Sequence, residues 1–171
     1  MEQKTIEILS RHRLMAVATV RSDGWPQNTI VGYVNDGLLL YFLISRSSQK
    51  FANIAQDNRV SIAIGGDFKF THNIEGISAA AWASEVTEMD QREHAYRLLV
   101  GRHPEYGAFS TPDYERAAVM RARCEVVTVI DYSQGFGHAD VVNVGAGGIV
   151  SMTAARPDNW GLTPAAEPLT S

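Results

Sequence analysis

The chain has 171 residues, of which 45% are hydrophobic and 20% are charged, a composition typical of a folded protein with one substantial core. Its 15 lysines and arginines stand against 19 aspartates and glutamates, which gives a formal net charge of −4 at neutral pH. A mildly acidic chain lacks the broad positive surface that nucleic-acid binding requires, so an anion site has to be local. We therefore expect no nucleic-acid partner.

The single cysteine, Cys124, excludes an intramolecular disulfide and a cysteine-rich metal site. It lies in the apolar run RARCEVVTVI and is predicted to be a buried structural thiol. The five histidines are scattered, with no pair at metal-ligand spacing, and we predict no metal site. The charged N-terminal residues lack a signal peptide's apolar segment, and no stretch is long enough to span a membrane. We expect a cytoplasmic protein with no membrane partner.

The beginning of the chain predicts a short helix followed by three strands. In the helix, Ile6 and Leu9 lie on one side with charged residues around them. The strands are expected at residues 14–20, 27–34 and 38–44. Ser-Asp-Gly and Asn-Asp-Gly turns separate them, because glycine tolerates the positive φ of tight hairpins. This pattern predicts an antiparallel meander.

A second short helix is predicted directly after the third strand. Ser47 or Ser48 can cap its exposed backbone amides. Phe51, Ile54 and Ala55 have the spacing of one buried helical face.

The remainder of the chain predicts three more strands and a third helix. The strands are expected at residues 59–64, 76–86 and 119–130. The helix lies between the last two strands, where Thr87 and Asp90 have capping-box spacing and Ala95 and Leu99 mark a core face. A further helical turn is predicted at Thr111-Pro112, because proline suits the first helical position.

Six antiparallel strands and a few short helices predict a mainly β fold, a small barrel whose sides the helices cover. Closure of the barrel would remove the exposed edges of the sheet. We expect one domain over residues 1–144. A C-terminal extension or tail is expected over residues 145–171, where glycine and proline become frequent.

The stretch LISRSSQK, residues 43–50, places an unusual set of polar residues between an apolar strand and the start of a helix. A helix N-terminus presents unpaired amides and the positive end of the helix dipole. Ser47 and Ser48 offer hydroxyl donors. Arg46 and Lys50 add two positive charges, so the stretch matches the needs of a phosphate monoester. The alternative is that Ser48 only caps the helix and that both cations are solvated.

The same region contains an ordered series of motifs. Ser48-Gln49-Lys50 opens the second helix, and Asp57-Asn58-Arg59-Val60-Ser61 follows it. Together with the preceding strands, this series over residues 14–64 resembles the pyridoxamine 5′-phosphate oxidase-like flavoproteins. The later run DYSQGFGHADVV, residues 131–142, is also similar to members of that superfamily.

The resemblance implies a six-stranded antiparallel split β-barrel of the FMN-binding type, a homodimer with the cofactor at the subunit interface. Ser48 and Lys50 would hold the FMN phosphate, with Arg46 beside them. Ile44 and Ser45 would lie near the polar edge of the isoalloxazine ring. Four residues of the second strand would lie along that ring: Asn28, Thr29, Ile30 and Val31.

The function implied is that of an FMN-dependent oxidoreductase that passes hydride or electrons through the cofactor to a small molecule. The chain departs from the oxidase at Gln49, where the oxidase has an arginine, and it lacks the arginine- and histidine-containing C-terminal substrate motif. Pyridoxamine phosphate oxidase activity itself is therefore not expected.

Three alternative functions are compatible with the same barrel fold. One is a reductase that uses the deazaflavin F420. Another is a flavin- or haem-binding protein with a storage, stress or sensing role and no turnover. The third is a barrel that has lost its cofactor. His138, in a glycine-rich loop after the last predicted strand, is a candidate to influence a bound cofactor.

Overall fold

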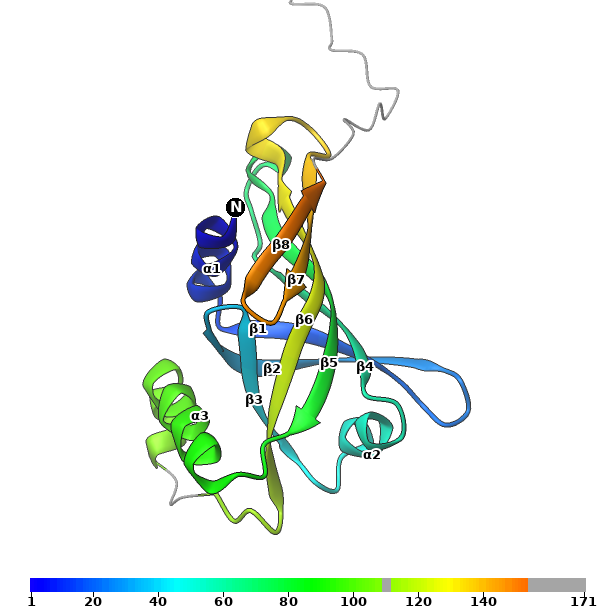
Figure 1. Cartoon of the computed structure of the whole chain (residues 1–171), viewed down its shortest axis with the longest axis vertical. Helices are drawn as coiled ribbons and strands as arrows, with labels where there is room; N and C mark the ends of the chain where they lie inside the picture. Colours follow the sequence, from blue (N-terminus) through cyan, green and yellow to red (C-terminus); the bar gives the residue numbers. More distant parts are fainter. Residues whose placement is uncertain (109–111, 154–171) are drawn as a thin grey trace, which may run out of the picture.

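The computed structural model describes residues 1–108 and 112–153 and has a mainly β fold (Figure 1). Its strands are β1 (Leu14–Val20), β2 (Pro26–Asp36), β3 (Leu39–Ser45), β4 (Arg59–Gly65), β5 (Glu75–Glu85), β6 (Ala117–Asp131), β7 (Ala139–Gly145) and β8 (Gly148–Thr153). Its helices are α1 (Glu2–Arg11), α2 (Gln49–Gln56) and α3 (Met89–Arg102), with short 3-10 turns η1 (Thr71–Asn73), η2 (Pro104–Ala108) and η3 (Tyr132–Gln134).

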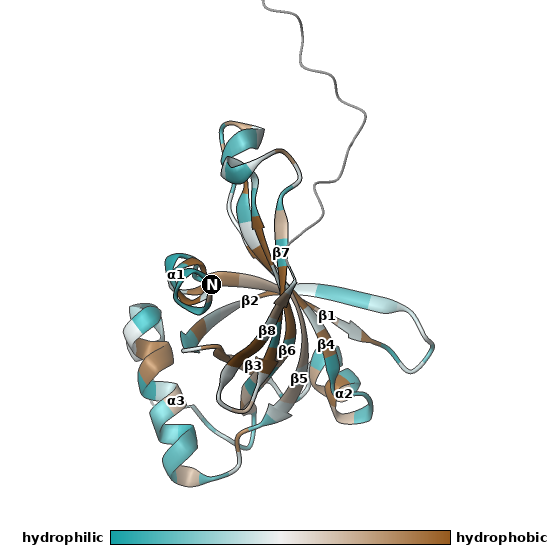
Figure 2. Cartoon of the chain, turned by 45° about the horizontal axis from the view of Figure 1, so that its top comes forward, coloured by the Kyte–Doolittle hydropathy of each residue, from teal (hydrophilic) through white to brown (hydrophobic). Residues whose placement is uncertain are grey.

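Six of the strands close into an antiparallel barrel in the order β3-β2-β1-β4-β5-β6, and β6 pairs again with β3. The long strand β6 makes closure possible because it pairs with β5 on one side and with β3 and β7 on the other. The predicted six-stranded barrel is therefore confirmed. Helix α2 lies on the opposite side of the barrel from α1 and α3 (Figures 1 and 2).

Strands β7 and β8 form a hairpin that extends the sheet beyond β6. The sequence does not predict these strands, because their glycines resemble a loop. In the structure Gly145 ends β7, and Gly148, with φ +120°, begins β8, so these glycines form the hairpin turn itself. Strand β8 occupies residues that the sequence assigns to the C-terminal extension, and residues 154–171 lie outside the described ranges.

The main hydrophobic core fills the barrel. Along β4 buried and exposed residues alternate, with Val60, Ile62 and Ile64 directed inward, as expected for a strand with one covered face. A second cluster joins α3 to the outside of β3 and β6 through Leu99, Tyr41 and Val119. Figure 2 shows β3 as strongly apolar, whereas apolar and hydrophilic residues alternate along α3.

Several local predictions need correction. The capping box at Thr87 and Asp90 is wrong, because Glu88 is the N-cap of α3 and makes no side-chain cap. The helical turn occurs at η2, whereas Pro112 is in no helix and Thr111 lies outside the described residues. Cys124 is buried in β6, where burial raises the pKa of its thiol to about 11, in agreement with the predicted structural role.

Candidate functional site

The candidate site lies where β2 and β3 separate. Residues 33–36 of β2 pair with β3, but residues 26–32 pair with β1 alone in the described part of the chain. The end of β3 meanwhile follows β6, with Ile44 opposite Ala118. One edge of β2 is therefore left without a strand partner beside the β3–α2 connection.

Helix α2 is fastened to the β1–β2 hairpin by Asn53, which is 1% exposed. The Asn53 amide donates to Thr19 Oγ1 at 2.9 Å and to Gln27 Oε1 at 3.1 Å. Its carbonyl oxygen accepts from Gln49 Nε2 at 2.9 Å. Helix α2 starts at the end of β3 and is bonded to β1 and β2. It therefore fixes the end of β3 relative to the β1–β2 hairpin.

Three serines shape the corner between β3 and α2. Ser48 is the N-cap, as predicted: its hydroxyl accepts from the Phe51 amide at 3.2 Å and donates to the Ser45 carbonyl oxygen at 2.7 Å. The hydroxyls of Ser45 and Ser47 lie 2.8 Å apart. The amides of Gln49 and Lys50, in the first turn, have no acceptor inside the helix.

Arg46 is not a solvated cation. Its guanidinium makes a two-pronged ion pair with Glu85 of β5, in which Nη1 donates to Oε2 at 3.0 Å and Nη2 donates to Oε1. Its Nε donates to the carbonyl oxygen of Tyr114 at 2.8 Å. Hydrogen bonding to Glu85 raises the pKa of Arg46. Glu85 thus neutralises the charge of Arg46, which the sequence alternative of a solvated cation does not include.

Lys50, in contrast to Arg46, has no ion-pair partner in the described part of the chain. It lies half-buried in the first turn of α2, and its ammonium makes no ion pair or hydrogen bond among the described residues. Burial lowers the pKa of Lys50, because desolvation disfavours the charged form. A partly desolvated cation without a counter-charge, beside free helix amides, is suited to accept an anion.

The predicted ring-contacting residues alternate along the unpaired edge of β2. Thr29 and Val31 point inward, whereas Asn28 and Ile30 point outward, and Ile30 is 70% exposed. Thr29 Oγ1 is buried and has no hydrogen-bond partner in residues 1–108 and 112–153. The four β2 side chains predicted to contact the ring therefore do not share one face of the strand.

Sequence reasoning missed two residues that organise the site. The predicted face of α2 includes Ala55, which is exposed, whereas Asn53 is buried in its place. Glu85 is 39 positions from Arg46, so no local pattern links them. The available signal for Asn53 is its position one residue before the apolar Ile54, which places it at the edge of the buried helical stripe.

Two of the five histidines have partners in other parts of the fold. His138 is half-buried, with Nε2 3.3 Å from Asp140 Oδ2, in the β6–β7 connection at the other end of the molecule from α2 (Figure 1). His103 is 2% exposed, and its Nε2 lies 2.9 Å from the Tyr33 carbonyl oxygen. Among the described residues, no group of three or more histidine, cysteine, aspartate or glutamate side chains could hold a metal ion. No described helix has the length and apolar character of a membrane span.

Three solved structures resemble this fold. The haem-binding protein from Mycobacterium smegmatis matches 84% of this chain with a TM-score of 0.71 and 20% identity. The haem storage protein HutZ from Vibrio cholerae matches 72% of the chain and 89% of its own length, with a TM-score of 0.62 and 20% identity. A FAD-binding protein from Mesorhizobium loti matches 75% of the chain and 91% of its own length, with a TM-score of 0.59 and 16% identity.

These identities are low, so the three matches establish the shared fold and leave cofactor and activity open. The chain spans 58% of the length of the M. smegmatis protein. Comparison with family models gives a match to the pyridoxamine 5′-phosphate oxidase model over residues 1–131, which includes the whole six-stranded barrel. This chain belongs to the pyridoxamine 5′-phosphate oxidase family.

Proposed function

We propose that this protein binds FMN and acts as an FMN-dependent oxidoreductase on a small molecule. The observation that supports the proposal most strongly is Lys50, a half-buried cation without a counter-charge among the described residues. A phosphate group at the start of α2 would neutralise it and would accept from the free amides of the helix's first turn. Burial of a lysine without such a ligand carries a desolvation penalty.

The other predicted residues fit FMN to different degrees. Ser48 would act by capping α2, because its hydroxyl is already engaged at both ends. Arg46 would fix the corner through Glu85 and add little net charge. The edge of β2 over residues 26–32 would offer backbone hydrogen-bonding groups to the flavin ring, and Ile44 and Ser45 lie at the end of β3.

Bound FMN would supply the hydride- or electron-transfer chemistry. The chain's own residues would bind the phosphate, orient the ring along β2 and restrict the access of water. No acid or base at the site is required for this role.

We propose that the protein works as a homodimer. The outer face of β1 and β2 exposes Leu14 (57%) and Ile30 (70%), and the turn between the two strands exposes Trp25 (70%), next to the strand edge that FMN would contact. A second copy of the chain would cover these apolar side chains and complete the cofactor site.

An absorbance scan of the purified full-length protein, followed by titration with FMN, tests the proposal. Oxidised-flavin bands, or saturable FMN binding with flavin reduction by NAD(P)H, are the expected result. A colourless protein that does not bind FMN would contradict it.

Haem binding is the second candidate, because two structurally similar proteins are a haem-binding protein and a haem storage protein. The same scan separates the candidates, since a haem complex has a Soret band that a flavin lacks. Bound F420 would be recognised by its own absorbance maximum.

A further inference from the structure

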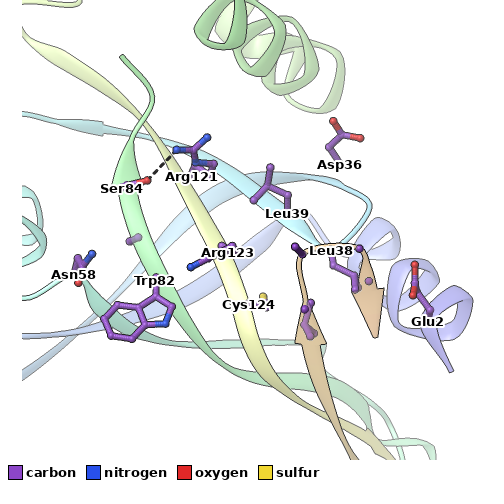
Figure 3. Close-up of a pocket in the computed structure, with 16 residues that line it drawn as sticks. Glu2, Asp36, Leu38, Leu39, Asn58, Trp82, Ser84, Arg121, Arg123 and Cys124 are labelled. Carbon is purple, nitrogen blue, oxygen red and sulfur yellow. Dashed lines mark hydrogen bonds between the residues drawn. The ribbon is translucent and has the colours of Figure 1, made fainter. Parts of the chain in front are cut away.

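A second pocket lies on the outer wall of the barrel. It is a groove of about 720 Å³ between β3, β5 and β6, and the β7–β8 turn forms one of its sides (Figure 3). None of the nine residues predicted to contact FMN lines it. Its volume lies within the range of small-molecule pockets.

Two arginines on β6 project into this groove (Figure 3). Arg123 is exposed and makes no hydrogen bond or ion pair within the described part of the chain. Arg121 donates to two neutral groups, Gln91 Oε1 at 3.2 Å and Ser84 Oγ at 3.5 Å. Two guanidinium groups two residues apart on one strand, neither bound to a carboxylate, form a ready site for an anionic group.

The carboxylates at the far end of the groove are already engaged. Glu2 Oε2 accepts from the Ile149 amide at 3.0 Å, which ties α1 to β8. Asp36 Oδ2 lies 3.0 Å from His94 Nε2. None of the described carboxylates is bonded to Arg121 or Arg123, and that of Glu125, two positions along β6 from Arg123, is bonded to the Trp82 indole.

Arg123 lies between an aromatic and an apolar neighbour. Trp82 of β5 pairs with it on one side and Leu39 of β3 on the other. Trp82 is 37% exposed, and its Nε1 donates to Glu125 Oε2 at 2.8 Å, a bond that orients the indole. An oriented indole beside an arginine provides a flat surface for a ring next to a site for its charge.

We propose that this groove binds an organic anion that carries a carboxylate or phosphate on a flat apolar ring. The anionic group would bind Arg121 and Arg123, and the ring would lie against Trp82. The site is separate from the FMN corner and does not depend on the proposed function.

Titration of the full-length protein with 2-naphthoate tests this site, with the uncharged 2-naphthamide as the matched ligand. The readout is the indole N–H signal of Trp82 in a ¹⁵N-correlated spectrum, identified among the three tryptophans with Trp82→Phe. We expect naphthoate to shift the Trp82 signal and to bind about tenfold more tightly than the amide, because only the acid forms charge-assisted bonds to the arginines.

Arg123→Gln should weaken naphthoate binding about tenfold, whereas Arg116→Gln, at an exposed position outside the groove, should not change it. FMN titration of Arg123→Gln should give the wild-type affinity, which separates this site from the flavin corner. If Arg123→Gln is not folded, Arg121→Gln replaces it under the same criterion. Equal binding of acid and amide, or wild-type naphthoate affinity in the folded arginine variant, would overturn the proposal.

Discussion

Asp131, at the end of β6, shows how one buried side chain can join distant parts of the barrel. Its carboxylate accepts from the Ser133 amide at 3.1 Å, the Ser133 hydroxyl at 2.6 Å and Gln134 Nε2 at 2.7 Å. Lys4 of α1 donates to the same carboxylate. Burial alone would raise the pKa of Asp131, but these bonds outweigh it and hold the pKa well below the ordinary value.

A depressed pKa in the folded state makes stability depend on pH. The contribution of Asp131 is complete above the ordinary aspartate pKa of about 4, and it is lost as the pH falls toward the lower folded-state pKa. We expect Asp131→Asn to be less stable than wild type by about 1–3 kcal/mol at pH 7 and to lose less stability on acidification. Urea unfolding at a series of pH values measures both. Parallel pH profiles for the two proteins would contradict the assignment.

Gly32 of β2 lies so close to two aromatic rings that they leave no room for a side chain. A Cβ atom there would lie 2.8 Å from the Tyr106 hydroxyl and 3.0 Å from His103 Cε1. Neither ring can easily move, because the two are stacked with centroids 5.1 Å apart and His103 is bonded to the Tyr33 carbonyl.

We expect Gly32→Ala to lower the free energy of unfolding by about 1–3 kcal/mol, the range for overpacking. The matched control is Gly101→Ala in α3, where a Cβ meets nothing within 4 Å and should stabilise the helix. Adding Tyr106→Phe to Gly32→Ala should recover part of the loss. Urea unfolding measures all three, and equal stability of Gly32→Ala and wild type would refute the steric argument.

For single residues, the sequence predicts the features that depend on neighbours in the chain. Ser48 is identified as a cap because its hydroxyl acts within three residues, and Cys124 as buried because its neighbours are apolar. The neutralisation of Arg46 by Glu85 could not be predicted, since it depends on how β5 lies beside the β3–α2 corner.

Among the elements, α2 has the largest influence on the candidate site. It starts at the end of β3 and is bonded through Asn53 to the β1–β2 hairpin. The position of Lys50 relative to the edge of β2 therefore depends on Asn53.

We expect Asn53→Ala to lower the free energy of unfolding by about 1–3 kcal/mol, because it leaves the buried partners of the amide unsatisfied. It should also weaken FMN binding by loosening the corner. Gln56→Ala, an exposed change in the same helix, should stay within about 0.5 kcal/mol of wild type. Urea unfolding and FMN titration provide the two readouts, and wild-type values for Asn53→Ala in both would show that this amide does not organise the site.

At the scale of the whole molecule, the barrel can be predicted from the sequence, because the apolar patterns of strands and the residues of tight turns are local signals. The pairing of β6 with β3 joins residues about 80 positions apart and could only be inferred from the need to cover edges. The β7–β8 hairpin was missed because the glycines that form its turn resemble the composition of a tail.

The proposed homodimer belongs to this scale as well. Ile30→Asp places a charge on the exposed face of β2 and should convert the dimer to a monomer with weaker FMN binding. Val150→Asp is the matched control, since Val150 is equally exposed at 70% but lies on β8. Sedimentation equilibrium distinguishes the species. A wild-type monomer, or a dimer that Ile30→Asp leaves intact, would contradict the proposed interface.

The most direct test of the central claim, that Lys50 anchors the FMN phosphate, is the FMN dissociation constant of Lys50→Gln. We expect it to rise about tenfold, since one charge-assisted hydrogen bond is lost. Lys69→Gln, a change of the same kind at an exposed lysine in the loop between β4 and η1, should retain the wild-type value. Equal FMN affinity in Lys50→Gln and wild type would show that the phosphate does not bind at the start of α2.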